Sequence, residues 1–131
     1  MPEYMLDTDT VSFALRGQGR AAARILECRP SGLCISSITL AELRFGAAAR
    51  RSKRLHALIG TFADTVLVAP FDAAAAERFG EVAASLAGRG EPIGGFDTLL
   101  AAHALSLDLT FVTRNARHFT RVTGLRTEDW I

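Results

Sequence analysis

The sequence predicts an α/β fold in which a mostly parallel central sheet is flanked by helices on both faces. Two observations indicate this class. Short apolar runs bounded by turn residues alternate with longer stretches of helical periodicity, which is the pattern of strand–helix–strand units. The 131 residues are enough for one domain with its own core, and no internal repeat, linker or low-complexity segment interrupts them. We therefore expect residues 1–131 to form a single domain.

The predicted strands are short apolar runs that end at turn residues or at proline. They cover residues 3–6, 33–36, 66–69, 110–113 and, as a short final strand, 125–130. The third run is closed by Pro70, which lacks the N–H group that would continue a sheet ladder. Nearly continuous apolar runs of this kind are typical of strands buried on both faces.

The predicted helices lie between these strands. They cover residues 11–16, 20–29, 38–50, 55–62, 73–86 and 96–107, with a helical turn at 116–119. Thr8-Asp9-Thr10 is predicted to cap the first helix, and Asp72 the long alanine-rich one. The third and fourth helices are expected to form a hairpin.

Composition and charge exclude several classes of protein. Hydrophobic residues make up 49% of the chain and the mean hydropathy is +0.19, and much of this is alanine, which favours closely packed helices and a buried interface. No apolar run approaches the roughly 20 residues that span a bilayer, and the N-terminus lacks the basic start of a signal peptide, so we expect a cytoplasmic protein. A net charge of +1 argues against binding nucleic acid through overall charge.

The cysteines and histidines do not suggest a zinc site. Cys28 and Cys34 are the two cysteines, and the three histidines stand singly in the sequence. We expect both thiols to stay unpaired, because disulfides are rare in the cytoplasm and free cysteine packs as a small hydrophobic residue.

The basic residues are almost all arginine. Lys53 is the one lysine among 15 basic residues, and arginine suits two-pronged contacts to phosphate or carboxylate. Arg50, Arg51, Lys53 and Arg54 form a cluster. The sequence leaves open whether this cluster is a solvated helix end or a patch that contacts phosphate.

Four acidic or amide residues close to the ends of apolar runs give the clearest indication of function. They are Asp7, Glu42, Asp97 and Asn115. Open α/β sheets place their functional side chains just beyond the carboxyl ends of the strands. Carboxylates that converge there repel one another unless a cation joins them, and Mg²⁺ or Mn²⁺ prefers oxygen ligands of this kind. We therefore predict a metal-dependent site at this edge of the sheet.

Three of the nearby polar residues also have a structural interpretation. Asp9 is either a second metal ligand or the cap of the first helix. Thr39 and Glu42 fit a capping box, in which the glutamate binds the backbone N–H of the cap residue. Asn115 fits the start of a turn. The sequence alone does not decide between these interpretations and the functional one.

Asp97 is harder to explain as a structural residue. It stands among apolar residues at the start of a predicted helix, where the helix dipole favours an anion. The preceding Gly94-Gly95 suggests that the backbone packs closely against another part of the chain.

The order and spacing of these segments resemble the PIN-domain ribonucleases, and specifically the VapC-type toxins of bacterial toxin–antitoxin pairs. The matching segments are residues 4–9, 41–46, 93–104, 113–119 and 124–130. The resemblance covers essentially the full length, and the combination of segments is specific.

The resemblance assigns roles to the site residues. Asp7, Glu42 and Asp97 match the acidic triad that holds Mg²⁺ or Mn²⁺ in this family, and Asn115 matches its fourth polar position. Asp9 stands where the family usually has asparagine, which adds a negative charge. The resemblance further implies a cytoplasmic endoribonuclease toxin that blocks translation by cutting a structured RNA. This RNA would be either a transfer RNA, such as initiator tRNA, or ribosomal RNA. The family also forms homodimers and hetero-oligomers in which a VapB-type antitoxin neutralises the toxin.

Two alternative functions are weaker. A haloacid-dehalogenase-type phosphatase would match the segment from Asp7 to Val11, but it needs a lysine after a later strand, and Lys53 precedes the third strand. A non-catalytic PIN-like module that binds RNA or protein would normally have lost a carboxylate, and all three remain.

Overall fold

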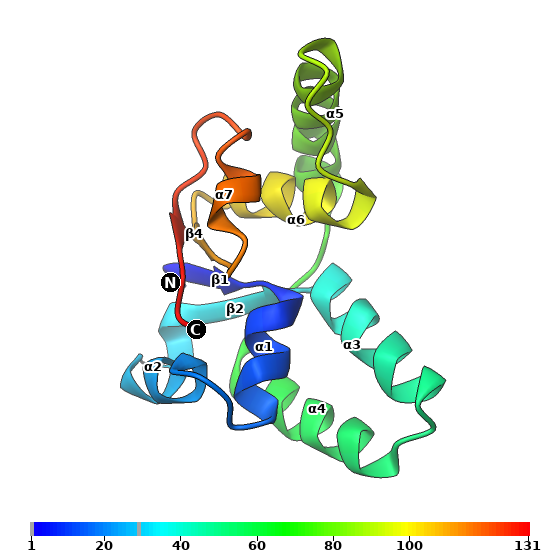
Figure 1. The fold of residues 1–131 in the computed structure, drawn as a ribbon, viewed down its shortest axis with the longest axis vertical. Coiled ribbons are helices and arrows are strands. Elements are labelled where there is room, and N and C mark those ends of the chain that lie inside the picture. The colour runs from blue at the N-terminus through cyan, green and yellow to red at the C-terminus, as the bar shows by residue number, and fades with distance from the viewer. Residues whose placement is uncertain (1, 29) are drawn as a thin grey trace.

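The computed structural model describes residues 2–28 and 30–131, in which a fully parallel five-stranded sheet is covered by helices (Figure 1). The strands are β1 (Tyr4–Leu6), β2 (Leu33–Ser36), β3 (Leu67–Ala69), β4 (Thr110–Val112) and β5 (Thr127–Glu128). Their order is β3-β2-β1-β4-β5, and each neighbouring pair is parallel. The first strand of the chain is therefore the central strand of the sheet. The predicted α/β class with a mostly parallel sheet is confirmed.

Helices connect the strands and supply the surrounding layers. They are α1 (Thr8–Leu15), α2 (Ala21–Glu27), α3 (Ser37–Ala49), α4 (Lys53–Thr65), α5 (Ala73–Gly88), α6 (Gly95–Ser106) and α7 (Ala116–Phe119), and a 3₁₀ turn spans Pro30–Gly32. The predicted hairpin of α3 and α4 is present, and the Arg44 guanidinium on α3 donates to the carbonyl oxygen of His56 on α4 at 2.9 Å. Figure 1 shows α5, α6 and α7 on one side of the sheet and α1, α2 and α4 on the other.

The alternation of side chains along each strand divides the core into two layers. Met5 and Phe111 are buried on the α5–α6 side, whereas Leu6 and Val112 are buried on the side of α1 and α4. Successive side chains of a strand point to opposite faces of the sheet. Because both faces of this sheet are covered by apolar core, successive residues of an inner strand are both apolar. This explains why the strands of this chain are continuous apolar runs in the sequence.

The first helix begins earlier than predicted. Asp7 is its cap, because the Asp7 carboxylate accepts a hydrogen bond from the backbone N–H of Thr10 at 2.8 Å. The prediction that Thr8-Asp9-Thr10 caps a helix starting at Val11 is wrong, and residues 8–10 form the first helical turn. The cap predicted at Asp72 is confirmed, since its carboxylate accepts from Ala75 N–H at 3.0 Å.

The remaining differences concern element ends. The helix predicted over residues 20–29 spans Ala21–Glu27, and its predicted last residue, Arg29, lies outside the described residues. The final strand is shorter than predicted, at Thr127–Glu128.

Cys28 and Cys34 are free thiols, and Cys34 is buried. Over residues 2–28 and 30–131, no helix is both long and apolar enough to cross a membrane.

Candidate active site

Asp7 joins the central strand to the first helix. It directly follows β1, is 6% exposed, and its Oδ1 atom is occupied as the cap of α1. Burial raises the pKa of the Asp7 carboxyl, while hydrogen bonds from Thr10 and Thr113 oppose that rise. The structure places this carboxylate at the carboxyl end of the sheet, directly after β1.

Glu42 lies on α3 and is held toward the first helix. Its Oε1 atom accepts a 2.7 Å hydrogen bond from the hydroxyl of Thr8. Ser36 caps α3 by accepting from the backbone N–H of Ile38 at 3.0 Å, so the capping-box interpretation of Thr39 and Glu42, which the sequence left open, does not hold. Because Ser36 already supplies the cap, the structural interpretation of Glu42 loses its basis.

The surroundings of Glu42 are acidic. Burial is the main cause that raises its pKa, and the negative charges of Asp97, Asp9 and Asp7 raise it further. The Thr8 hydroxyl opposes this rise by donating to the charged form. Glu42 therefore lies within electrostatic range of the other carboxylates predicted for the site.

Asp97 lies in the first turn of α6, as predicted from the sequence. Its pKa is raised by burial and by Asp9, and lowered by His118, whose Nε2 atom is 3.4 Å from the Asp97 carboxylate. The preceding Gly94 has a φ of +99°, which favours glycine, and a Cβ atom at Gly94 or Gly95 would meet open space. The prediction of close backbone packing at these glycines is wrong, because Gly94 serves the backbone turn that starts α6.

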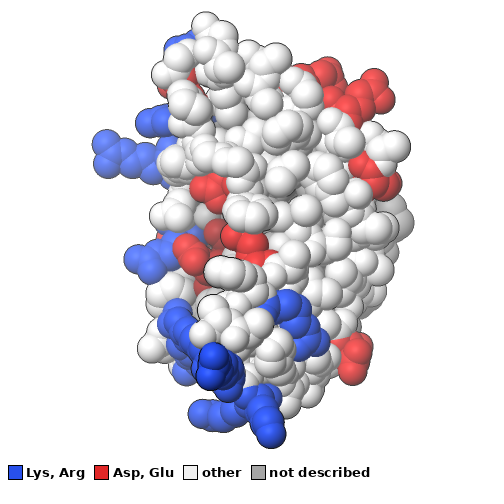
Figure 2. Space-filling model, turned by 90° about the vertical axis from the view of Figure 1, so that its right-hand side faces the viewer, with Lys and Arg blue, Asp and Glu red and all other residues white. Residues whose placement is uncertain are grey.

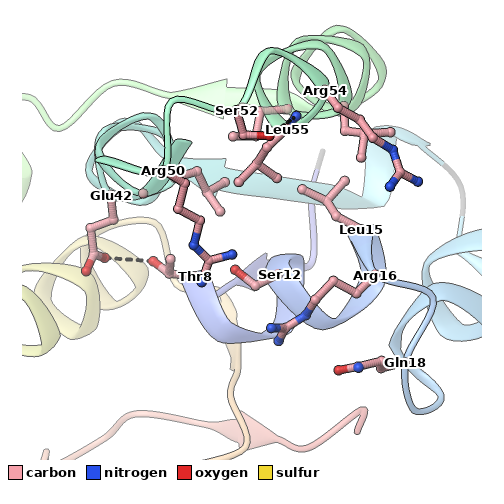
Figure 3. A pocket seen from close by; sticks show the side chains of 14 residues that line it. Thr8, Ser12, Leu15, Arg16, Gln18, Glu42, Arg50, Ser52, Arg54 and Leu55 are labelled. Atoms are coloured by element: carbon pink, nitrogen blue, oxygen red, sulfur yellow. Dashed lines mark hydrogen bonds between the residues drawn. The ribbon is translucent and has the colours of Figure 1, made fainter. Parts of the chain in front are cut away.

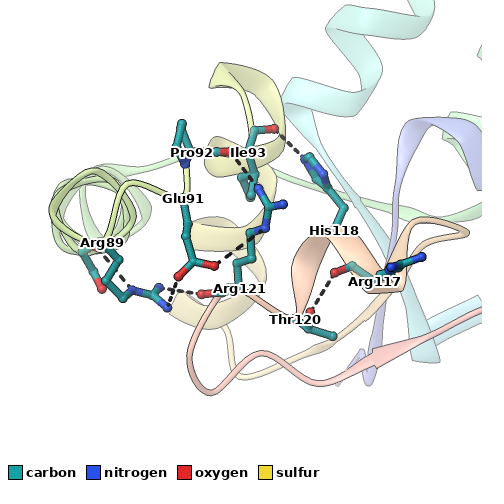
Figure 4. Close-up of polar contacts among 9 residues, drawn as sticks. Arg89, Glu91, Pro92, Ile93, Arg117, His118, Thr120 and Arg121 are labelled. Atoms are coloured by element: carbon teal, nitrogen blue, oxygen red, sulfur yellow. Dashed lines mark hydrogen bonds and ion pairs between the residues drawn. The ribbon is translucent and has the colours of Figure 1, made fainter.

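A set of contacts fixes the loop that leads into α6 (Figure 4). His118 Nε2 lies 2.8 Å from the carbonyl oxygen of Ile93, and the Arg121 guanidinium donates to the Pro92 carbonyl at 3.2 Å. The Glu91 carboxylate forms ion pairs with the guanidinium groups of Arg89 and Arg121, at N–O distances of 3.6 Å and 4.0 Å. The loop and Asp97 are thus tied to the segment around α7.

Asn115 lies just past the carboxyl end of β4, at the same edge of the sheet. It is exposed, it begins α7, and its side chain makes no capping hydrogen bond. Its backbone N–H donates to Thr113 Oγ1 at 3.0 Å, and its carbonyl oxygen accepts from His118 N–H at 2.8 Å. The turn interpretation of Asn115 therefore applies to its backbone, and a functional role for its side chain stays a prediction.

Asp9 does not cap a helix and adds to the acidity of the site. It is exposed within the first turn of α1. Its charge raises the pKa values of Asp7, Glu42 and Asp97. Asp9 is the one residue that affects all three.

The donor set fits Mg²⁺ or Mn²⁺. Three carboxylates of the site, those of Asp7, Glu42 and Asp97, are partly or fully buried and have raised pKa values. Neighbouring groups therefore do not fully balance the cost of burying their negative charges. In the ion pairs of residues 2–28 and 30–131, only His118 pairs with one of them. Within those residues, no three His, Cys, Asp or Glu side chains are already grouped as a complete cation site. A hard divalent cation would supply the missing positive charge.

The raised pKa values of the three carboxyls, which are caused first by burial and then by neighbouring negative charge, predict that these groups destabilise the free protein as the pH rises. The three carboxyls have higher pKa values in the folded chain than in the unfolded chain, so the folded state binds more protons. Their contribution to the free energy of unfolding is present below about pH 4, which is near the pKa of these carboxyls in the unfolded chain. It is lost as the pH rises through their higher pKa values in the folded chain. Thermal unfolding measured from about pH 4 to about pH 7 should show a smaller decline for Asp97→Asn than for the parent chain. Parallel pH profiles for the two proteins would contradict this account.

The comparison with known proteins agrees with this arrangement. The family model described as PIN domain matches residues 4–125. The chain belongs to the PIN-domain family. The matched range includes the positions of Asp7, Glu42, Asp97 and Asn115.

This PIN domain is similar over its whole length to several characterised relatives. It is 41% identical over 131 residues to the tRNA(fMet)-specific endonuclease VapC of Shigella flexneri, covering 99% of each chain. Among solved structures, the DNA-bound VapBC from Salmonella typhimurium superposes with a TM-score of 0.91 at 38% identity and 100% coverage of both chains. VapBC2 from Rickettsia felis, bound to a DNA fragment from its promoter, gives a TM-score of 0.86 at 30% identity, covering 98% of each chain.

Three polar residues of the site carried no clear signal in the sequence. Thr8 orients Glu42, His118 lies against Asp97, and Thr113 donates to Asp7. Thr8 and Thr113 each lie next to a strand end, so their position was available from the sequence. The position of His118 beside Asp97 could not be inferred from the sequence, because it depends on how α7 packs beside α6.

Proposed function

We propose that this PIN domain is a metal-dependent endoribonuclease that acts as the toxin of a toxin–antitoxin pair. The observation that carries the proposal is that Glu42 lies within electrostatic range of Asp97, Asp9 and Asp7. An acidic pocket by itself repels RNA, so a cation is needed before a phosphodiester can enter. Asp7, Glu42 and Asp97 would hold Mg²⁺, with Mn²⁺ as a substitute, and the ion supplies an activated water and neutralises charge on the phosphate.

The residues of the chain have distinct tasks in this reaction. Asp7 is fixed by its bond to Thr10 N–H, and Thr8 fixes Glu42, so neither carboxylate needs to be ordered when substrate arrives. His118 is anchored on the Ile93 carbonyl and limits the movement of Asp97. Asn115, which follows β4, is the fourth proposed site residue and would contact the substrate or a water molecule.

We further propose initiator tRNA as the substrate. The relative from Shigella flexneri, 41% identical over nearly the whole of both chains, is named as specific for tRNA(fMet). A relative from Salmonella typhimurium, 38% identical, carries the same name. Ribosomal RNA is the second candidate substrate. Cleavage of either RNA in the cytoplasm would block translation.

The proposed partner is a VapB-type antitoxin, and the proposed assembly is a toxin homodimer within a toxin–antitoxin hetero-oligomer. Two of the solved structures that are similar to this chain are of VapBC bound to DNA. An arginine of the antitoxin that enters the acidic pocket would pair with two carboxylate oxygens and take the place of the cation. Phe45 on α3 and Phe96 on α6 are 75% and 58% exposed, which supports a protein interface near Glu42 and Asp97.

Expression of the chain in bacterial cells, with and without its neighbouring small gene, tests this function. We expect growth to stop when the chain is expressed alone and to resume when the antitoxin is co-expressed. Sequencing the 5′ ends of RNA fragments after induction should give one dominant site in initiator tRNA. The purified chain should cut the same RNA with Mg²⁺ and lose that activity in EDTA. Normal growth with intact RNA, or full cleavage in EDTA, would overturn the proposal.

A further inference from the structure

A cavity of about 530 Å³ lies between α1, α3 and α4, directly beside the carboxylates (Figure 3). Thr8 and Glu42 line one end of it, and these are the two residues joined by the 2.7 Å hydrogen bond at the site. Three arginines also line it, Arg16 on α1, Arg50 at the end of α3 and Arg54 on α4. We call it the arginine cavity. It continues the acidic site into a neighbouring space of opposite charge.

The guanidinium groups of the arginine cavity have no carboxylate partners. None of the ion pairs formed within residues 2–28 and 30–131 involves Arg16, Arg50 or Arg54, and all three are exposed. Five other arginines of the chain do pair with carboxylates: Arg24, Arg78, Arg89, Arg121 and Arg126. The N–H donors of the cavity arginines are therefore available to an anion from outside the chain.

Two of the three arginines are directed toward the same part of the cavity, and Arg54 lies at its other end. Figure 3 shows the Arg50 side chain reaching toward Thr8 and Ser12, with Arg16 directed toward the same region from the end of α1. Arg16 is held over the ring of Phe13 with its guanidinium carbon 5.0 Å from the ring centroid. Such stacking restrains the side chain without occupying its N–H donors. Figure 2 shows basic side chains gathered below the acidic atoms on one face of the molecule.

Five of the remaining lining residues are apolar and form one wall of the cavity: Leu15, Leu43, Leu55, Leu58 and Ile59. Ser12, Gln18 and Ser52 add polar groups to the lining. An apolar wall with a guanidinium rim matches the two halves of a nucleotide, whose base is flat and apolar on its faces and whose phosphate is an anion. The volume lies within the range of about 300 to 1,000 Å³ for small-molecule sites, so a single nucleotide fits in it.

We propose that the arginine cavity binds an unpaired nucleotide of the RNA substrate next to the phosphate that is cut. Its base lies against the apolar wall, and the backbone phosphates on either side contact Arg16, Arg50 and Arg54. This inference rests on the proposed function and narrows its substrate class to RNA that is single-stranded at the cleavage site, such as a hairpin loop. Bases that are splayed out of the stack are the usual targets of sequence-specific RNA-binding proteins.

Binding of RNA to the Asp97→Asn protein in EDTA tests the arginines separately from cleavage. The probes are a fluorescein-labelled RNA hairpin and the same strand annealed to its full complement. Arg50→Gln and Arg54→Gln should each weaken binding of the hairpin roughly threefold to tenfold and reduce the salt slope of log Kd by about 0.7. Arg126→Gln is the matched control, since Arg126 pairs with Asp108 at 3.0 Å and does not line the cavity.

A second measurement does not depend on protein variants. Hairpins that lack one base at successive loop positions should bind normally except at one position adjacent to the cleavage site, where the loss should be about tenfold. Equal affinity for hairpin and duplex, or arginine variants that behave like Arg126→Gln, would overturn the proposal. So would variants that lose affinity for the antitoxin alone, because the cavity would then be a protein-docking site. Arginine-dependent binding in a chain whose parent cuts no RNA would support this inference and contradict only the proposed function.

Discussion

Replacing Asp97 with asparagine is expected to abolish RNA cleavage and to leave the protein at least as stable as the parent chain. The carboxylate of Asp97 would hold the cation, and loss of one charged ligand should lower the rate by at least about 100-fold. Its pKa is raised by burial and by Asp9, so the charged form disfavours folding at neutral pH. Asparagine removes that charge and keeps a similar volume.

The measurements are cleavage of initiator tRNA with Mg²⁺ and thermal unfolding of the metal-free proteins at neutral pH. Asp64→Asn is the matched control, because Asp64 is exposed on α4 and does not line the arginine cavity. It should leave both activity and stability unchanged. A fully active Asp97→Asn protein would remove Asp97 from the site. A clear loss of stability would show that its contact with His118 outweighs the repulsion.

Replacing Glu42 with glutamine is expected to lower the cleavage rate by about 100-fold or more with little change in stability. Glutamine keeps a side-chain oxygen that can accept from Thr8, so the substitution tests the charge and not the hydrogen bond. Since Ser36 caps α3, the helix does not depend on residue 42. Cleavage rates at several Mg²⁺ concentrations, combined with direct metal titration, measure the effect.

Two control variants separate the charge of Glu42 from its orientation. Thr8→Val keeps the Glu42 charge but removes the hydroxyl that holds it, and should lower the rate only about tenfold, as expected for a group that orients a ligand. Glu77→Gln makes the same chemical change at an exposed position on α5 and should have no effect. Near-normal cleavage and unchanged metal affinity for Glu42→Gln would leave Glu42 with a structural role.

The fold was predictable because the inner strands of this sheet are buried on both faces. Leu33–Ser36 is buried at every position, and such a run stands out in the sequence without any alternation. The helix that starts at Ala73 was equally clear, because Asp72 is a strong capping residue. The order of the strands was not predictable from these local signals, since it depends on which runs pair across the sheet.

The site was predictable in its carboxylates but not in its cap assignments. Local spacing suggested that Asp9 capped α1 and that Glu42 closed a capping box, yet Asp7 and Ser36 supply these caps. Capping preferences are similar for Ser, Thr, Asp and Asn, so adjacent candidates are not separated by sequence. The pairing of His118 with Asp97 joins residues on α7 and α6 and has no local signal.

The arginine cavity shows the same limit. The sequence marked the basic cluster at residues 50–54 but left its role open. Only the packing of α1 against the α3–α4 hairpin brings Arg16 to the same space as Arg50 and Arg54. Long-range arrangement, and not residue type, turns a basic helix end into a candidate binding site.

The central position of β1 affects when the protein becomes functional during its synthesis. Tyr4–Leu6 is the first strand to leave the ribosome, but it pairs with Leu33–Ile35 on one side and Thr110–Val112 on the other. Asp97 and Asn115 also belong to the last third of the chain. The nascent polypeptide therefore carries no assembled catalytic centre until nearly all of it has been translated. Under the proposed function, the growing chain would gain nuclease activity only at the end of its synthesis, after Asp97 and Asn115 have left the ribosome.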